Sequence, residues 1–203
     1  MLTPDVGDVT LRWALPDDRA ALGEICRRTG DAGSDATGTL VHGELYGLVW
    51  AEQYLVLEPS FALVADLDGV AHGYVLAAPD TAAFEARLEE EWWPHLRARY
   101  PLPGDGTDVD RRLVHHLHHP TRTSAAVTER YPAHLHIDLL PDVQGRGLGR
   151  RMIQAIEQRL AEAGCRGVHL GVDPRNQRAI GFYTHLGYRA HTDDGVVLFT
   201  KRL

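Results

Sequence analysis

The stretch LLPDVQGRGLGRRM, residues 139–152, joins an apolar run to the start of an amphipathic segment. Its three glycines and three arginines are Gly145, Gly147, Gly149, Arg146, Arg150 and Arg151. A turn between a strand and a helix leaves N–H groups at the helix start without partners, and the helix dipole makes that end positive. Glycines let a ligand approach the backbone closely, and arginines pair with phosphate oxygens. The stretch therefore predicts a site for a phosphate or pyrophosphate group.

Two common phosphate loops do not match this stretch. It lacks the Lys followed by Ser or Thr of a nucleoside-triphosphate loop. Its G-x-G-x-G order, with no early strand–loop–helix unit, also departs from a dinucleotide fingerprint. The other interpretation of the stretch is a glycine-rich turn with a solvated basic face, because loose loops of this kind are common.

The segments around this stretch predict alternating strands and helices. Alternation of apolar and polar residues favours a strand over 133–140. Its apolar positions are Leu135, Ile137 and Leu139, and its polar positions are His134, His136 and Asp138. Apolar residues every four positions predict a helix from Leu148 that ends at Gly164. Beyond it we expect a strand at 167–172, a helix at 176–187, a turn at Asp194 and Gly195, and a strand at 196–203.

The first half of the chain carries the same alternation. In order, we expect a strand at 9–13, a helix from Asp17 to Gly30, a polar loop at 31–39, a helical segment at 45–57 and a hairpin over 61–78 that turns at Asp68 and Gly69. Residues 80–131 interrupt this pattern with helix-like and Pro/Gly/Asp-rich segments, which indicates an inserted subdomain. We expect one α/β (α+β) domain over 1–203.

Composition narrows the class of protein. Hydrophobic residues make up 44% and charged residues 24%, and no apolar run approaches the ~20 residues that span a bilayer. Met1 to Thr10 lack the basic start and apolar block of a secretory signal. The two cysteines, Cys26 and Cys165, lie far apart, as in proteins of a reducing compartment. We therefore expect a cytoplasmic protein that does not act on membranes.

Two further kinds of ligand are not expected. A formal charge of −7 disfavours nucleic acid as a partner, because that binding needs clustered Lys and Arg. The histidine-rich stretch HHLHH at 115–119 invites a metal site, since histidine is a common zinc ligand. No carboxylate or cysteine completes a known spacing such as H-E-x-x-H, so we expect no metal.

Two motifs resemble the GNAT superfamily of N-acetyltransferases. Residues Gln144 to Gly149 resemble its Q/R-x-x-G-x-G/A acetyl-CoA loop. Its N-x-x-A-x-x-(F/L)-Y-x-x-x-G-(F/Y) pattern is matched by Asn176, Ala179, Phe182, Tyr183, Gly187 and Tyr188. The match to the common core covers roughly 133–190. The whole chain is similar to the acetyltransferase-like domain at the C-terminus of O-GlcNAcase, and it keeps intact a loop that is degenerate in the animal members.

The resemblance implies a fold and a cofactor site. The fold would be a central mixed, mostly antiparallel sheet flanked by helices, with a helical insert between its third and fourth strands. The cofactor would be acetyl-CoA, with the backbone of Leu139 and Leu140 binding the pantetheine arm. The pyrophosphate would lie on Gln144, Gly145, Arg146, Gly147, Leu148, Gly149 and Arg150. Asn176 and Tyr183 would line the thioester end.

Acetyl transfer to an amine needs a neutral nucleophile and a proton for the departing thiolate. The family pattern makes Tyr183 the candidate acid, although a packed aromatic with a satisfied hydroxyl is the alternative. Asp138, His134 and His136 are the candidates for the base, because they share the polar face of the 133–140 strand. That face is alternatively one that packs under a helix with its histidines hydrogen-bonded.

The resemblance implies an N-acetyltransferase that transfers acetyl directly from acetyl-CoA to an amine on a small molecule or peptide. The alternative is a noncatalytic acyl-CoA-binding or scaffold domain, because fold does not fix function. The loop at 31–39 and the insert at 80–131 are where variable acceptor-binding elements are expected. A homodimer is left open.

Overall fold

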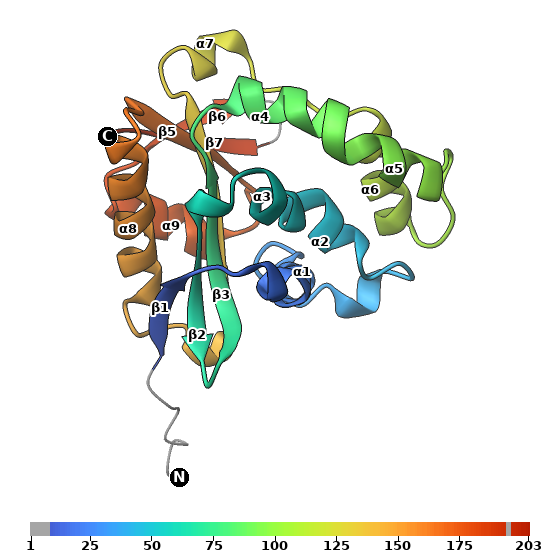
Figure 1. Cartoon of the computed structure of the whole chain (residues 1–203), viewed down its shortest axis with the longest axis horizontal. Helices are drawn as coiled ribbons and strands as arrows, with labels where there is room; N and C mark the ends of the chain where they lie inside the picture. The colour runs from blue at the N-terminus through green and yellow to red at the C-terminus, as the bar shows by residue number, and fades with distance from the viewer. Residues whose placement is uncertain (1–8, 194–195) are drawn as a thin grey trace.

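The computed structural model describes residues 9–193 and 196–203, and within them the strands form one sheet (Figure 1). The expected turn at Asp194 and Gly195 and the segment before residue 9 lie outside the described residues. The strands are β1 (Thr10–Trp13), β2 (Ala62–Leu67), β3 (Val70–Ala78), β4 (Ala133–Leu139), β5 (Gly167–Val172), β6 (Arg189–Asp193) and β7 (Val196–Arg202). Their order in the sheet is β1-β2-β3-β4-β5-β7-β6. Only β4 and β5 pair in parallel, which confirms the expected mixed, mostly antiparallel sheet.

Helices cover both faces of this sheet. They are α1 (Arg19–Thr29), α2 (Leu45–Trp50), α3 (Glu52–Leu57), α4 (Thr81–Arg87), α5 (Trp93–Arg99), α6 (Asp108–His118), α7 (Ala125–Thr128), α8 (Leu148–Glu162) and α9 (Gln177–His185). Figure 1 shows α8 and α9 on one face and α1 to α3 on the other, with α4 to α6 extending beyond α2. None of the described helices is long and apolar enough to cross a membrane.

Two hydrophobic cores follow from the alternation of side chains along the strands. On one face the apolar stripe of α8, including Met152 and Ile156, packs against Leu135 of β4. On the other face Tyr74 and Leu76 of β3 pack beneath α1, α2 and α3. Of the polar positions of β4 on this face, the side chains of His136 and Asp138 remain 33% and 19% exposed.

The sheet divides between β4 and β5. These strands pair only at Ala133 with Val168 and at His134 with His169, and they diverge beyond those residues. The N–H of Leu140, just past β4, donates to the carbonyl of His72 on the β3 side. Because the amides of alternate strand residues point to opposite edges, those of Ile137 and Leu139 face the gap toward β5. The fold thus leaves strand backbone available at one end of the parallel pair.

The insert lies between β3 and β4, as expected. It runs from α4 through a π-helical turn, Leu88–Trp92, into α5, and then through α6 and α7. The insert packs against α2, because the indole N–H of Trp92 donates to the carbonyl of Leu48 at 2.9 Å. Residues 80–131 therefore share the core of the α1–α3 side.

Two elements differ from the sequence-based expectation. The expected helical segment at 45–57 is two helices, because Ala51 adopts φ −132° and ψ −51° and interrupts the helical hydrogen bonds. The strand β6 was not predicted, and it pairs antiparallel with β7 at the sheet edge. Its sequence, RAHTD, lacks the branched apolar residues that signal a strand.

Candidate functional site

The glycine loop ends as the N-terminus of α8. Gly147 caps the helix in the left-handed region, with φ 71°, and Gly145 also has a positive φ of 76°. Within the described part of the chain, no turn or loop carbonyl accepts a hydrogen bond from the N–H groups of Gly145 to Arg150. A Cβ placed on Gly145 or Gly147 would meet no atom within 4 Å. The loop is therefore an open set of N–H donors at the positive end of a 15-residue helix.

The side chain of Gln144 fastens this loop to its neighbours. Its Nε2 donates to the carbonyl of Leu139 at 2.6 Å, and its Oε1 accepts from Arg178 of α9 at 2.6 Å. This amide thus links the end of β4 to α9, so the geometry favours a loop-orienting role over direct phosphate binding. Arg146 and Arg150 are exposed and form no ion pair with a described carboxylate, so both guanidinium groups are free to reach an anion.

Of Leu139 and Leu140, whose backbones were both expected to bind the pantetheine arm, only Leu139 is placed to do so. The N–H of Leu140 donates to His72 at 2.9 Å, and its carbonyl accepts from Val143 at 3.1 Å. Both backbone groups of Leu140 therefore have partners, which argues against its expected contact with a pantetheine arm. The N–H of Leu139 faces the gap instead, while the Leu139 carbonyl already accepts from Gln144. The backbone of Ile137 faces the same gap by alternation.

Tyr183 lies on α9, beside the gap. Its ring packs against Phe182, Tyr188 and Phe199, with centroids 5.3, 5.4 and 5.5 Å away, and the residue is 5% exposed. Its hydroxyl makes no hydrogen bond with any residue the structure describes. Burial raises the pKa of Tyr183, and the nearby charge of Asp138 raises it further. The hydroxyl therefore keeps its proton at neutral pH and has no protein acceptor for it.

Asp138 belongs to a polar cluster on the opposite face of β4. The hydroxyl of Tyr74 donates to its Oδ2 at 2.6 Å, and Nε2 of His136 lies 3.1 Å from the same oxygen. The carboxylate is 19% exposed and its Oδ1 has no partner among the described residues. Asp138 is thus held by one oxygen, with the other oxygen available.

His136 is fixed from both ring nitrogens. Its Nδ1 donates to the carbonyl of Trp50 at 2.9 Å, because a carbonyl can only accept. Burial lowers the pKa of His136, but the charge and hydrogen bond of Asp138 outweigh burial and raise that pKa above its usual value of 6.5. The carboxylate therefore favours the protonated imidazole and pairs with it.

His134 is a buried, satisfied histidine. Thr81 donates its hydroxyl hydrogen to the carbonyl of Pro132, so its Oγ1 accepts from Nδ1 of His134 at 2.8 Å. Nε2 then accepts from the hydroxyl of Tyr54 at 2.7 Å. Burial lowers the pKa of His134 to about 3. Both nitrogens have partners, so the geometry argues against the expected role of His134 as a base.

Asn176 caps α9 and supports a turn of the 31–39 loop. Its Oδ1 accepts from the N–H of Ala179 at 3.0 Å, and its Nδ2 lies 3.0 Å from where a Cβ on Gly33 would stand. The same turn is held by Arg175, which pairs with Asp31 at 2.9 Å. The contacts of Asn176 are therefore with α9 and this turn, and they give its expected place at the thioester end no support.

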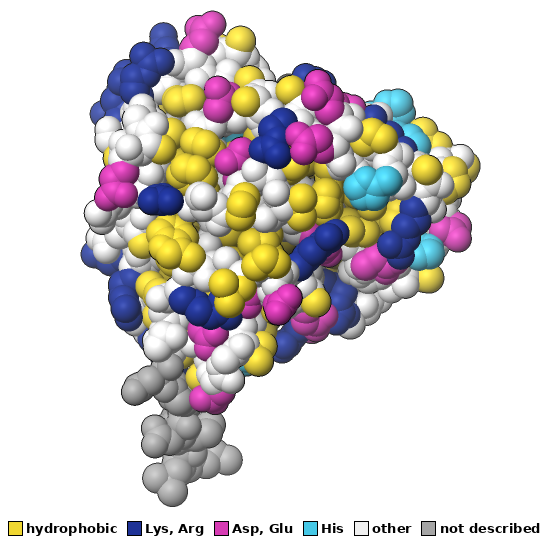
Figure 2. All heavy atoms as spheres, in the orientation of Figure 1, with side chains coloured by type: hydrophobic (Ala, Val, Ile, Leu, Met, Phe, Trp, Pro, Cys, Tyr) yellow, Lys and Arg dark blue, Asp and Glu magenta, His cyan; other side chains and the backbone are white. Residues whose placement is uncertain are grey.

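Three residues of the site carried no signal in the sequence. Tyr74, Trp50 and Arg175 belong to no motif, and they reach the site only through strand register or helix packing. Histidine side chains also gather at the insert end of the face shown in Figure 2. Across residues 9–193 and 196–203, no three potential metal ligands come together.

Known proteins share this fold and these motifs. Residues 112–188 match the acetyltransferase (GNAT) family model. The chain is 25% identical over 193 residues to protein O-GlcNAcase of Rattus norvegicus, covering 92% of this chain and 20% of the relative. The chain thus spans about a fifth of the length of the O-GlcNAcase relatives that it matches.

Solved structures extend the comparison. SsHAT is 37% identical and superposes with a TM-score of 0.90, over 96% of this chain and 98% of that chain. The PaiA N-acetyltransferase of Thermoplasma acidophilum, solved with coenzyme A, is 15% identical with a TM-score of 0.57, over 97% of this chain and 99% of that chain. The second likeness shows the fold alone. Taken with the family model and the intact loop, the SsHAT match shows that the chain belongs to the GNAT family of acetyltransferases.

Proposed function

We propose that this chain transfers the acetyl group of acetyl-CoA directly to an amine. The observation that carries the proposal is the free amides of the glycine loop at one end of a gap in the sheet, with the tyrosine of α9 beside that gap. These features offer an anion site, an extended backbone for an amide-containing arm and a proton donor. The proposal covers this chain only and says nothing of the reaction of the longer relatives.

Acetyl-CoA fits the residues present. Its pyrophosphate carries the negative charge that the amides from Gly145 to Arg150 and the guanidinium groups of Arg146 and Arg150 would hold. Its pantetheine amides match the strand N–H of Leu139, which faces the gap. When bound, it supplies an acetyl group activated as a thioester.

The proton steps fall to two residues on opposite sides of the gap. Asp138 accepts the proton that the amine loses, through its free Oδ1, while Tyr74 and His136 hold Oδ2. Tyr183 donates a proton to the departing sulfur, because its hydroxyl is protonated and has no protein acceptor. One proton leaves the amine and one reaches the sulfur, and solvent restores both residues.

We propose an amine on a small molecule or peptide as the acceptor, and a cytoplasmic location, which the two free cysteines support. The chain is proposed to act as one domain with its insert at 80–131, and a homodimer stays a prediction.

A thiol-release assay tests this function. Purified protein is mixed with acetyl-CoA and a panel of primary amines, including polyamines, aminoglycosides and lysine peptides. Amine-dependent release of CoA above the amine-free rate, with the acetylated amine found by mass spectrometry, is the expected result. Tight acetyl-CoA binding with no release for any amine would favour the noncatalytic alternative and would sink the catalytic proposal.

A further inference from the structure

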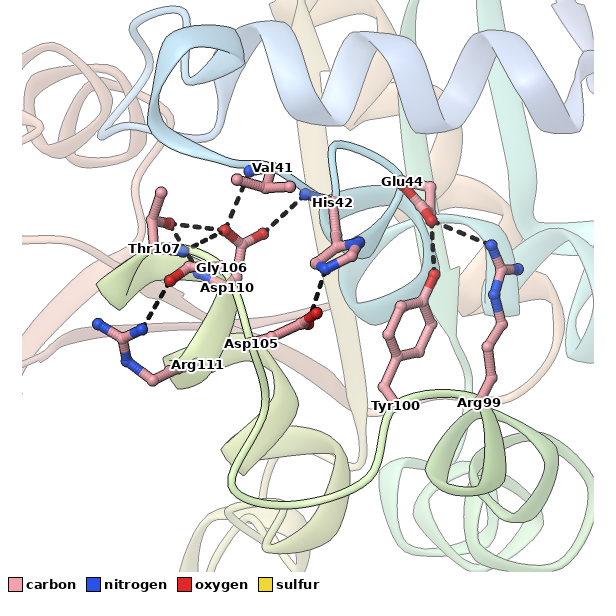
Figure 3. A network of polar contacts seen from close by, with 10 residues as sticks. All are labelled: Val41, His42, Glu44, Arg99, Tyr100, Asp105, Gly106, Thr107, Asp110 and Arg111. Carbon is pink, nitrogen blue, oxygen red and sulfur yellow. Dashed lines mark hydrogen bonds and ion pairs between the residues drawn. The ribbon is translucent and has the colours of Figure 1, made fainter.

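The short helix α2 receives contacts from the insert at its start, its middle and its end. The contact at the start centres on Asp110 of α6, whose side chain is fully buried (Figure 3). Its carboxylate accepts from the N–H groups of Val41 and His42, both at 3.0 Å, just before α2. It also accepts from the N–H of Thr107 at 2.8 Å within the insert. The carboxylate of Asp110 thus joins the segment before α2 to α6 of the insert.

The other contacts lie at the middle and the end of α2. The indole N–H of Trp92 donates to the carbonyl of Leu48 at 2.9 Å. The ring of His116 on α6 lies against the ring of Trp50, with centroids 4.5 Å apart. Burial, with a smaller contribution from His115, lowers the pKa of His116, so this ring is neutral and suits an apolar contact. The last residue of α2 therefore rests on a residue of the insert.

Trp50 also belongs to the polar cluster of the site. The break at Ala51 diverts the next helical hydrogen bond, because the N–H of Tyr54 bonds to the carbonyl of Ala51. The carbonyl of Trp50 accepts instead from Nδ1 of His136 at 2.9 Å. The other nitrogen of that imidazole lies 3.1 Å from Asp138. A continuous set of contacts therefore runs from α6 through Trp50 to the carboxylate.

We propose that the insert is a positioning element for the site, in which His116 holds Trp50 so that its carbonyl orients His136 against Asp138. Asp110 holds the segment before α2 in place through the N–H groups of Val41 and His42. The catalytic consequence rests on the proposed acetyl transfer, but the orientation of His136 does not. Neither His116 nor Asp110 touches the reacting groups.

Several groups face His136 from the elements packed around it. Asp138 and His134 are its neighbours on β4, Tyr74 faces it from β3 with ring centroids 5.4 Å apart, and α2 contributes only the carbonyl of Trp50. Asp138 is the one acidic group among them, and Tyr74 holds it in place. A change at His116 leaves all of these side chains intact and reaches His136 only through the Trp50 carbonyl.

The test is the titration of His136 in the full chain, followed by NMR of histidine-labelled protein and assigned by the signal that His136→Gln removes. His116→Ala is expected to shift the pKa of His136 toward 6.5, because a looser Trp50 carbonyl stabilises the imidazolium less. His116→Phe, which keeps a stacking ring, is expected to restore it. His115→Ala, an exposed neighbour on α6, is the matched control and is expected to leave it unchanged.

Activity gives the second readout. His116→Ala is expected to lower kcat about fivefold, as loss of positioning does, with the Kd of acetyl-CoA within about twofold. An unchanged His136 titration in folded His116→Ala, or an equal shift in His115→Ala, would overturn the positioning role. If His116→Ala does not fold, His116→Gln replaces it and is read in the same way. Failure of the proposed function is a separate result, since wild-type protein with no turnover still reports the titration.

Discussion

Tyr183 packs in the core on the α8 side of the sheet, and Asp138 contacts Tyr74 of the core on the α1–α3 side; each retains one polar atom without a partner among the described residues. The Tyr183 ring is buried and its hydroxyl is protonated, and the Asp138 carboxylate is anchored at Oδ2 alone. Neither atom is fully enclosed, so a ligand can reach both of them. Among the described side chains, the one fully buried polar atom without a partner is Oε1 of Gln53 on α3.

Tyr183→Phe tests the acid. The substitution removes only the hydroxyl, so the aromatic packing is retained and the Kd of acetyl-CoA is expected to stay within about twofold of wild type. Loss of the proton donor is expected to lower kcat about 100-fold, the usual scale for general acid catalysis. Stopped-time thiol release measures it. An unchanged kcat would show that the sulfur takes its proton from water.

Asp138→Asn tests the pairing with His136. Because the carboxylate raises the pKa of His136, its neutralisation is expected to lower that pKa below the wild-type value, and NMR titration follows the change. The wild-type pair contributes stability at pH below the unfolded pKa and loses it as pH rises through the higher folded pKa. In the variant, the stability that protonated His136 contributes is expected to be lost at a lower pH than in wild type. A His136 titration that does not move would show that the two residues do not interact.

At this scale the sequence placed the polar face of β4 correctly but could not rank its members. His134 and His136 look alike in the alternation. What separates them is Thr81 and Tyr54, which are 53 and 80 residues away from His134, and the carbonyl of Trp50, 86 residues from His136. Such partners become visible only when the elements are packed.

Among the elements, the turn after α1 is constrained by its backbone geometry. Ala32 and Gly33 have φ of 50° and 88°, and the turn rests on the cap of α9. Residues other than glycine are disfavoured in this region by roughly 1–2 kcal/mol each. The strain is consistent with a turn held in place to border the gap.

Gly33→Ala is expected to destabilise the protein by about 1–2 kcal/mol, because Ala at this φ is strained. A Cβ there would also stand 3.0 Å from Nδ2 of Asn176. Urea unfolding measures the change, and Gly38→Ala in the same loop is the control, since its Cβ would meet no atom within 4 Å and its φ is not positive. Equal stability of the two variants would contradict the strain at Gly33.

Element types were predictable where periodicity was strong. The helix from Leu148, the β4 strand and the hairpin around Asp68 and Gly69 all appear as expected. The break at Ala51 was not predictable, because Ala favours helix and the apolar pattern continues through it.

In the molecule as a whole, several polar contacts join the insert to the 31–44 segment, and the most buried of them is the carboxylate of Asp110. Burial alone would raise the pKa of Asp110, but the N–H groups of Val41, Thr107 and His42 and the Thr107 hydroxyl outweigh it and lower the pKa to about 2. The insert is therefore coupled to the rest of the fold by a group whose charge is stabilising.

Asp110→Asn is expected to destabilise the protein by about 3 kcal/mol at pH 7, because an amide places a donor opposite N–H groups. The folded pKa lies below the unfolded one, so the carboxylate contributes about 2 kcal/mol above pH 4 and loses it as pH falls toward about 2. Chemical unfolding of both proteins from pH 7 to pH 2 measures it. A gap between variant and wild type that stays constant with pH would contradict the pairing.

The sequence predicted the class of the sheet, its acetyltransferase family and the position of the insert. It did not predict which parts of the chain the insert would contact. The parallel pair of β4 and β5 and the gap beyond it depend on strand order, which local pattern does not encode. The motifs predicted the glycine loop as a cofactor site, and the packed structure was needed to distinguish the backbone contacts of Leu139 from those of Leu140.

Isothermal titration with acetyl-CoA tests the glycine loop as the cofactor site most directly. Wild-type protein is compared with Gly147→Trp, which fills the space over the loop, and with Gly181→Trp on α9, whose Cβ also meets no atom within 4 Å. We expect micromolar binding by wild type and by Gly181→Trp, and at least a tenfold weaker Kd for Gly147→Trp. No binding by wild type, or equal binding by all three proteins, would contradict acetyl-CoA at this loop.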